Sequence, residues 1–413
     1  RPHNKASLIW AIIIYKKQRS FTFFGGHLLR MSSDFLVKQK FHSFVGVSVD
    51  IGDRRSMEDE FMVQTTKNGL SYYGVYDGHA GSLASAYTKE NLCKSFFERS
   101  PKNMTNKSKL QSTMTEAHVA VDKAYFAHEQ EARKKGFSTF SGTTSVSLVM
   151  KQSEGWGFVA NAGDSRAVLF HQGKVVSLST DHRVNRSGVS NAEMERVISL
   201  GGWMEDGLMC GQLEPTRGIG DHDFKSFKSS KFSGKTFKGD LVTATPEYEW
   251  FSLTSDAEEI IDTTTCENEI SVGLTGDHYS FIVVASDGIW DVLPNCEVLQ
   301  IATERLSTNS QLNGEVVQQA ADELMRITRQ QARKKKQQMD NTTVILIAFA
   351  PCHDSGHYLS NDSSCLFCFE PSFTPHTESI INSKASSVAS SKKKKQKRNQ
   401  RRKKRQQANK RKK

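Results

Sequence analysis

Residues 72–81 read YYGVYDGHAG, an apolar run that stops abruptly at a carboxylate, a glycine and an imidazole. The aromatic and β-branched side chains predict a buried strand that ends in a polar turn. At the end of a rigid strand, Asp77 and His79 could be held as a metal ligand and a proton donor. Taken alone, Asp77-Gly78 would more often be an ordinary turn, and His79 a structural histidine.

The same arrangement occurs twice more along the chain. Residues 281–286 (FIVVAS) lead into Asp287 and Asp291, and Asp340 stands just before the apolar run 342–349 (TTVILIAF). Three apolar strands therefore carry carboxylates at their ends. This repetition, rather than any single acid, predicts that the strand ends meet at a metal site.

The remaining pattern predicts an α+β fold built on antiparallel sheets. Short strands follow one another closely, which is typical of hairpins rather than of βαβ units. The expected strands are 44–49, 61–64, 72–76, 145–150, 157–162, 167–170, 175–178, 281–286 and 342–349. The expected helices are 81–98, 114–135, 191–200, 297–305 and 314–336. Within 114–135, helical spacing predicts that Val119, Ala120, Ala124 and Phe126 are buried.

The net charge of +11 belongs to the end of the chain. Residues 392–413 contain 15 Lys and Arg and no acid, and without them 41 basic and 45 acidic residues give a net charge of −4. The body of the protein is therefore not expected to bind nucleic acid by itself. The basic run is typical of a nuclear localisation signal, or of weak contact with nucleic acid or an importin. It lacks the folded motif that sequence-specific readout needs.

Three segments are expected. Residues 1–41 form a poorly ordered extension, 42–351 a single domain, and 352–413 a disordered tail that ends in the basic run. The apolar stretch 8–15 is too short to cross a bilayer, so no membrane span is expected. Seven scattered cysteines are typical of a reduced, intracellular protein. We expect a monomer in the cytoplasm, the nucleus or both.

The polar residues at the strand ends and intervening turns form a strongly acidic set. It comprises Glu58, Asp59, Asp77, Asp164, Asp287, Asp291 and Asp340, together with His79. So many carboxylates near one point cannot all ionise unless cations compensate them. Oxygen ligands without a Cys/His cage favour Mg²⁺ or Mn²⁺ over zinc. Two such ions about 4 Å apart would lower the pKa of a water molecule and direct it at phosphorus. Arg54 offers a planar pair of donors that matches phosphate oxygens.

Nine short motifs resemble, in the same order, those of the type-2C, metal-dependent Ser/Thr protein phosphatases. They are R-x-x-M-E-D at 54–59, V-Y-D-G-H-A-G at 75–81, S-G-T-T at 141–144, A-G-D-S-R at 162–166, D-H-R at 181–183, T-R-G-I-G-D at 216–221, A-T-P-E at 244–247, A-S-D-G-I-W-D at 285–291 and D-N at 340–341. The resemblance extends over residues 42–351. Each motif is weak alone, but nine in the family's order do not arise by chance.

This resemblance implies a four-layer αββα sandwich, two antiparallel β-sheets flanked by helices. It also implies an enzyme that dephosphorylates serine and threonine in phosphorylated proteins with the help of two Mg²⁺ or Mn²⁺ ions. The implied metal ligands are Glu58, Asp77, Gly78 through its carbonyl, Asp287 and Asp340. Asp77 would bridge the two ions, and water would attack phosphorus directly without a phosphoenzyme.

The resemblance implies further roles around this centre. Arg54 would bind the substrate phosphate, and His79 would protonate the departing Ser/Thr alkoxide as a general acid. Asp164 and Asp291 match positions linked to a third, more weakly held ion. Asp59 would orient the metal ligands rather than bind an ion directly.

The chain departs from the family pattern in places that bear on substrate preference. Glu214 and Pro215 stand where the family usually has smaller or apolar residues, and the segments 222–240 and 255–277 are longer than the core needs. We expect 222–240 to be an exposed, cationic loop. The alternative function is a catalytically reduced, regulatory binding module with a nuclear or RNA-associating tail. The presence of Asp77, Asp287 and Asp340 favours the active enzyme.

Overall fold

The structure is a computed structural model of the chain. It describes residues 21–24, 27–30, 41–66, 69–101, 106–135, 140–183, 191–225, 237–254, 279–307 and 311–351. The basic run 392–413, the segment 255–277 and the apolar stretch 8–15 lie outside these residues. The fold described below belongs to a unit within residues 1–354.

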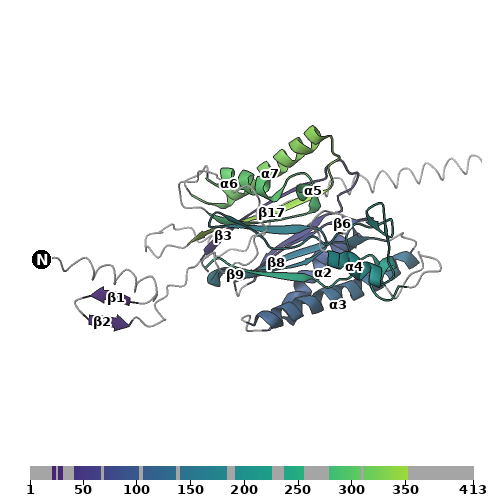
Figure 1. Cartoon of the computed structure of the whole chain (residues 1–413), viewed down its shortest axis with the longest axis horizontal. Coiled ribbons are helices and arrows are strands. Elements are labelled where there is room, and N and C mark those ends of the chain that lie inside the picture. Colours follow the sequence, from purple (N-terminus) through teal and green to yellow (C-terminus); the bar gives the residue numbers. More distant parts are fainter. Residues whose placement is uncertain are drawn as a thin grey trace, which may run out of the picture. The chain divides into compact units, whose positions relative to one another are not determined.

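Two five-stranded sheets form the centre of this unit, and every neighbouring pair of their strands is antiparallel (Figure 1). The first sheet has the order β11 (Lys174–Ser177), β10 (Arg166–His171), β16 (Ser280–Ala285), β17 (Thr342–Pro351) and β3 (Phe41–Asp50). The second has the order β15 (Glu247–Ser252), β9 (Trp156–Ala162), β8 (Ser145–Lys151), β5 (Leu70–Tyr76) and β4 (Glu60–Thr65). The strands predicted from sequence are thus confirmed, and β4 and β5 pair as the expected hairpin.

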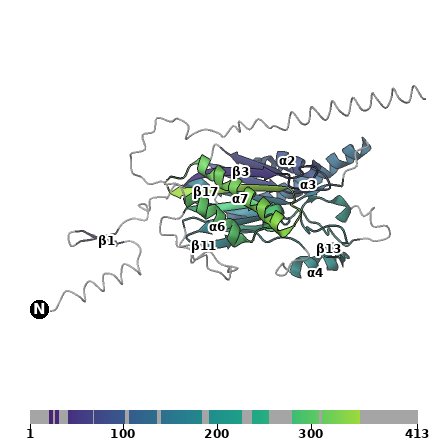
Figure 2. The ribbon, with the colours of Figure 1, turned by 90° about the horizontal axis from the view of Figure 1, so that it is seen from above.

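Helices cover the outer face of each sheet. The first sheet is covered by α6 (Asn295–Ser307) and α7 (Gly314–Lys335), and Figure 2 shows α7 lying over β17. The second is covered by α2 (Leu83–Arg99) and α3 (Lys107–Lys134). The result is the four-layer αββα arrangement that the motif resemblance implied. Both α3 and α7 are preceded by a capping asparagine, Asn106 and Asn313, whose side-chain oxygen accepts a backbone N–H of the first turn.

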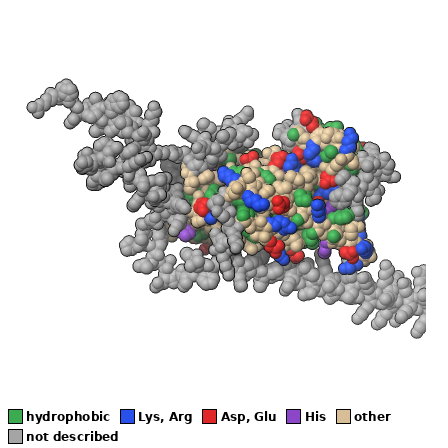
Figure 3. Space-filling view, turned by 90° about the horizontal axis from the view of Figure 1, so that it is seen from below, with side chains coloured by type: hydrophobic (Ala, Val, Ile, Leu, Met, Phe, Trp, Pro, Cys, Tyr) green, Lys and Arg blue, Asp and Glu red, His purple; other side chains and the backbone are tan. Residues whose placement is uncertain are grey.

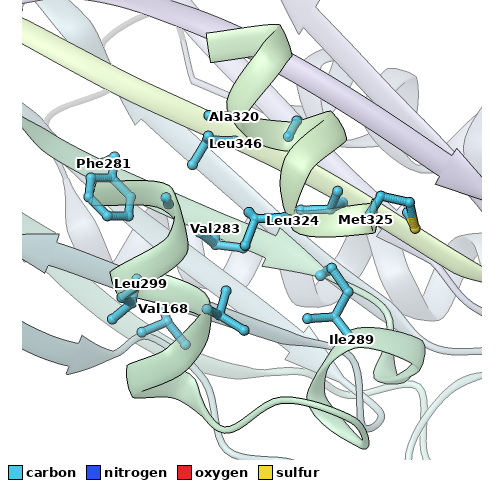
Figure 4. Packing of buried hydrophobic residues seen from close by; sticks show 14 of the residues in the cluster. Val168, Phe281, Val283, Ile289, Leu299, Ala320, Leu324, Met325 and Leu346 are labelled. Carbon is cyan, nitrogen blue, oxygen red and sulfur yellow. The ribbon is translucent and has the colours of Figure 1, made fainter. Parts of the chain in front are cut away.

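Three apolar layers hold the four structural layers together. Along β16 and β17, successive side chains point to opposite faces, so that Val283 and Leu346 pack against α6 and α7 whereas Val284 and Ile345 pack between the sheets. Figure 4 shows the outer of these layers, in which Leu324 of α7 lies close to Val283. This double burial explains why these strands read as continuous apolar runs rather than as alternating ones.

Shorter elements connect the layers and approach the site. They are β6 (Gly78–His79), β7 (Gly142–Thr143), η2 (Gln152–Glu154), α4 (Asn191–Ser199), β12 (Met204–Glu205), β13 (Leu208–Met209), β14 (Ile219–Gly220), η3 (His222–Phe224) and α5 (Asp287–Trp290). A small sheet of order β14-β7-β6 joins three of the predicted motifs. The turn between β10 and β11 uses Gln172 and Gly173, both with positive φ, as the two-residue hairpin there requires.

The expected buried face of α3 is wrong. The helix begins at Lys107 rather than 114, and of the four residues expected to be buried, Ala124 is exposed and the other three are only partly buried. The buried face instead includes the polar residues His118, Asp122 and Glu129. A pattern based on apolar spacing cannot find a face on which charged side chains are buried against partners from distant segments.

The segment 222–240 is not simply an exposed loop where the structure describes it. His222, Phe224, Lys225 and Phe237 are all buried, and Lys225 has no exposed surface.

Within the N-terminal extension, β1 (Phe21–Phe24) and β2 (His27–Arg30) pair as a hairpin that the sequence did not predict. Among the described helices, none has the length and apolar character needed to cross a membrane.

Candidate active site

The pairing of the strands brings the predicted acids to one end of the two sheets. Glu60 is opposite Tyr76, so Asp59 and Asp77 lie side by side just beyond the paired residues. In the other sheet Ala285 is opposite both Arg166 and Val344. The chain therefore turns at this same strand end next to three more acids, Asp164, Asp287 and Asp340.

Asp77 is fixed by its backbone. Its carbonyl accepts hydrogen bonds from the N–H of Thr144 at 2.9 Å and the hydroxyl of Thr143 at 3.0 Å. Its own N–H donates to the hydroxyl of Thr144 at 3.1 Å. A Cβ atom at Gly78 would overlap the carbonyl of Glu58, so only glycine allows the two segments to pack this closely.

Glu58 is also held from several directions. Its N–H donates to the side-chain oxygen of Asn341 at 2.8 Å, and Asn341 in turn donates to the carbonyl of Ile51 at 2.9 Å. One carboxylate oxygen of Glu58 accepts the N–H of Gly81 at 2.9 Å. The carbonyl of Glu58 accepts the hydroxyl of Ser85. The first and last of the family motifs are thus tied together.

Asp59 lies behind these residues with 5% of its surface exposed. One carboxylate oxygen accepts hydrogen bonds from the hydroxyls of Ser286 at 2.8 Å and Thr343 at 2.9 Å. The other oxygen is buried without a hydrogen-bond partner among the described residues. Burial, only partly offset by these hydrogen bonds, raises the pKa of Asp59 to about 6.

The carboxylates around Asp77 are close enough to perturb one another. Burial, and then the charges of Asp59, Asp287 and Asp164, raise the pKa of Asp77 well above its ordinary value. The pKa of Asp287 is raised well above its ordinary value by burial and by the charges of Asp164 and Asp291. Carboxylates that resist ionisation together, with an orphaned oxygen on Asp59, are chemically suited to divalent cations.

Ligating geometry is nevertheless not preformed. Within the described parts of the chain, no three His, Cys, Asp or Glu side chains are grouped as ligands of one metal ion. Two guanidinium groups compensate the acids instead. Arg54 forms an ion pair with Asp340, and Arg183 lies 3.2 Å from a carboxylate oxygen of Asp287. Opposite charges at these distances favour the ionised forms of the two acids.

His79 is oriented by a partner that the sequence did not assign. Its Nε2 atom lies 2.8 Å from Oδ1 of Asp221, the last residue of the T-R-G-I-G-D motif. A Cβ atom on Gly142 would overlap the Asp221 carboxylate, so the S-G-T-T motif needs glycine there. Although burial lowers the pKa of His79, the charge and hydrogen bond of Asp221 raise it above its ordinary value overall.

Four residues of the site were therefore missed as functional. They are Asp221, Arg183, Asn341 and Thr144. All four stand inside the quoted motifs, and that position was the signal that could have identified them. Their roles depend on contacts between residues far apart in the sequence, which the motifs do not reveal.

Comparisons with known proteins identify the family of this chain. The family model described as "Protein phosphatase 2C" matches residues 38–337. A "Probable protein phosphatase 2C 2" from Oryza sativa subsp. japonica is 32% identical over 319 residues, which cover 74% of this chain and 71% of the relative. A probable protein phosphatase 2C from Caenorhabditis elegans is 31% identical and covers 73% of each chain.

Solved structures show the same fold at low sequence identity. A serine-threonine phosphatase 2C from Toxoplasma gondii has a TM-score of 0.54 at 17% identity and covers 76% of this chain and 98% of its own. A Caenorhabditis elegans sex determining protein has a TM-score of 0.54 at 19% identity, with 74% of this chain and 64% of that chain covered. On the strength of the family model and the sequence relatives, the chain belongs to the protein phosphatase 2C family and is a protein serine/threonine phosphatase.

Proposed function

We propose that this phosphatase hydrolyses phosphoserine and phosphothreonine with two Mg²⁺ or Mn²⁺ ions at the acidic end of the two sheets. The observation that carries the proposal is the convergence of Asp77 and Asp287 at one end of the two sheets, where burial and then the charges of Asp59 and Asp287 raise the pKa of Asp77 well above its ordinary value. The ligands would be Glu58, Asp77, the carbonyl of Gly78, Asp287 and Asp340. When bound, the ions would lower the pKa of a water molecule and orient it towards phosphorus.

Arg54 would bind the substrate phosphate. Its side chain is 54% exposed and forms an ion pair with Asp340, which is itself 39% exposed. Because Asp340 is also a proposed ligand, a bound ion and Arg54 would share one carboxylate. The exposed guanidinium of Arg54 would then be available to pair with phosphate oxygens.

His79 would donate the proton that the leaving group needs. A serine or threonine alkoxide is a poor leaving group, and protonation by a positioned acid typically accelerates its departure by about 10²–10⁴-fold. With Asp221 accepting a hydrogen bond from Nε2 of His79, Nδ1 would be the nitrogen available to the leaving group. An ionised Asp221 cannot donate a proton, and therefore Nδ1 carries one only when the ring is an imidazolium.

One observation favours the alternative of a catalytically reduced binding module. Arg54 and Arg183 already compensate Asp340 and Asp287, so the fold does not require metal to neutralise every acid. A phosphate-release assay on phosphothreonine peptides separates the two functions. The enzyme should release phosphate with Mn²⁺ and stop with EDTA, whereas the binding module would release none in either condition.

Two variants make this assay specific to the site. Asp77→Asn should abolish Mn²⁺-dependent release while leaving the circular dichroism spectrum unchanged. Glu323→Gln removes an acid of the α7 surface, where Glu323 pairs with Arg326, and should retain activity. Full activity in a folded Asp77→Asn protein would refute the proposed ligand set.

We also propose that the chain acts as a monomer and that residues 392–413 direct it to the nucleus by binding an importin. The support is compositional, because 15 of these residues are Lys or Arg. On the face of the folded unit in Figure 3, acidic, basic and apolar side chains are interspersed, which offers no competing cationic surface there. Deleting 392–413 should abolish nuclear accumulation of a fluorescent fusion and leave phosphate release intact. Unchanged accumulation would refute this role.

A further inference from the structure

A single buried guanidinium gathers four carboxylates beside the proposed metal centre. The side chain of Arg183 has no exposed surface. Its Nε lies 3.2 Å from Asp164, its Nη1 lies 3.1 Å from Glu214 and 3.2 Å from Asp291, and its Nη2 lies 3.2 Å from Asp287. These acids come from three segments of the chain, because Asp287 and Asp291 share the motif at 285–291, and the guanidinium is the group on which they converge.

A fifth nearby acid, Asp181, is paired with a different cation, Arg166. Asp181 lies 3.9 Å from Arg183, but both of its oxygens accept hydrogen bonds from Arg166, at 2.9 Å and 2.7 Å. This bidentate pair compensates Asp181 separately. The charge of Arg183 therefore remains available to the other four carboxylates.

The backbone holds Arg183 in this place. The N–H of His182 donates to the carbonyl of Gly163 at 3.0 Å, next to Asp164, and the N–H of Thr216 donates to the carbonyl of His182 at 2.8 Å. The backbone of Arg183 also forms an isolated antiparallel β-bridge with Pro215. The residue is thus pinned between the turn that carries Asp164 and the segment that carries Glu214.

The guanidinium of Arg183 already supplies a positive charge to the four carboxylates around it. Burial alone would lower the pKa of Arg183, but the surrounding carboxylates raise it well above its ordinary value. A divalent ion entering among the same oxygens would meet a fixed positive charge that cannot move into water, because the whole side chain is buried. Removing a buried charge from its partners is strongly unfavourable.

We propose that Arg183 is a built-in cation that takes the place of a third divalent ion, so that Asp164 and Asp291 bind a guanidinium and the chain takes up two ions only. This inference rests on the proposed two-ion function. It replaces the expectation of a third ion at these two acids. It also gives Glu214, a departure from the family pattern, a role as an additional partner of Arg183.

The same contact would help the two-ion centre. A carboxylate has two oxygens, and Arg183 lies against only Oδ2 of Asp287. The guanidinium can therefore hold Asp287 in a fixed orientation while its second oxygen binds metal. In this arrangement the arginine is a positioning residue for a proposed ligand as well as a substitute for an ion.

Counting bound Mn²⁺ tests the inference without using catalysis. Equilibrium dialysis of the full chain against micromolar to millimolar Mn²⁺, with free ion measured by electron paramagnetic resonance, should give two ions per chain. Arg183→Gln should bind three, and the added ion should disappear in the double variant with Asp164→Asn. Arg183→Lys keeps the charge and should remain at two. Circular dichroism establishes that each variant is folded.

The outcomes separate this inference from the proposed function. Three ions in the wild type, or only two in a folded Arg183→Gln protein, would overturn the inference and leave the two-ion phosphatase standing. A wild type that binds no Mn²⁺ would overturn both. Where Arg183→Gln does not fold, Asp164→Asn in the wild-type background still decides the matter, because its count should stay at two. Loss of an ion in that variant would show that Asp164 is a ligand.

Discussion

The Nε2 atom of His79 lies 2.8 Å from Oδ1 of Asp221, although the two residues are 142 positions apart in the sequence. The small sheet formed by β14, β7 and β6 brings them together, since β7 pairs with both other strands. The side chain of His79 is 28% exposed, whereas the side chain of Asp221 is almost completely buried. The buried carboxylate is thus placed to orient the partly exposed imidazole and to stabilise its protonated form.

Replacing this carboxylate should change the pH dependence of the reaction. Asp221 raises the pKa of His79, so Asp221→Asn should lower that pKa and move the basic limb of the kcat profile to lower pH. The basic limb shifts to lower pH because the imidazolium, the form that donates the proton, then loses its proton at a lower pH. Phosphate release from a phosphothreonine peptide between pH 5 and 9 measures the shift. An unmoved basic limb with a uniformly lower rate would indicate a structural role only.

Replacing His79 itself should produce a loss that depends on the leaving group. His79→Gln should reduce kcat on a phosphothreonine peptide by about 10²–10⁴-fold, the usual contribution of a general acid. On p-nitrophenyl phosphate the loss should be much smaller, because nitrophenolate departs without protonation. Arg54→Gln is the matched comparison, since it removes a phosphate contact and should impair both substrates alike. Equal losses of His79→Gln on the two substrates would contradict the general-acid role.

The sequence was sufficient to predict the strands and the acids at their ends because both depend on local patterns. Strands that are buried on both faces form continuous apolar runs in the sequence. Asp77 and Asp287 each stand at the end of such a run. Once two strands pair, the positions of their terminal residues follow from the register. The order of the nine motifs matched that of a known family, and this resemblance predicted the αββα arrangement.

The contacts that compensate charge could not be predicted in this way. Arg183 meets acids that stand up to 108 residues away, and nothing near it in the sequence indicates them. Lys225 belongs to a lysine-rich stretch that predicts an exposed loop, yet its side chain is buried and donates a hydrogen bond to Asp122 of α3. In both cases a distant partner decides whether a charged side chain can be buried.

The pair formed by Lys225 and Asp122 should contribute strongly to stability. Lys225 donates to Oδ1 of Asp122 at 2.6 Å, and the same oxygen accepts the N–H of Gly220 at 2.8 Å, immediately before Asp221. Burial would raise the pKa of Asp122, but Lys225 and its other partners lower it to about 2. Lys225→Met leaves this carboxylate buried without its cation and should cost roughly 3–5 kcal/mol.

Urea denaturation monitored by circular dichroism measures that loss. The matched control is Lys94→Met, because Lys94 and its partner Glu98 are largely exposed and 4.0 Å apart. An exposed pair of this kind contributes at most about 1 kcal/mol. A Lys225→Met protein as stable as the Lys94→Met control would show that the buried pair is dispensable.

His118 should make the fold sensitive to acid. It is completely buried on α3, where Nδ1 donates to the carbonyl of Met114 at 2.9 Å and Nε2 accepts the hydroxyl of Ser145 at 3.2 Å. Both contacts suit a neutral ring, and burial lowers the pKa of His118 from 6.5 to about 4. Between these values the unfolded chain binds a proton that the folded chain does not, so stability falls as pH drops from 6.5 to 4.

The size of this effect follows from the shift in pKa. A difference of this size corresponds to roughly 3 kcal/mol, all of it lost by about pH 4. The free energy of unfolding, measured by urea denaturation in EDTA between pH 4 and 7, should therefore depend less steeply on pH in His118→Gln than in the wild type. His128→Gln is the control, because His128 lies on the same helix with its side chain exposed. The slope, rather than the absolute stability, is decisive, since either substitution can also alter packing. Parallel curves for the wild type and His118→Gln would mean that acid acts through other groups.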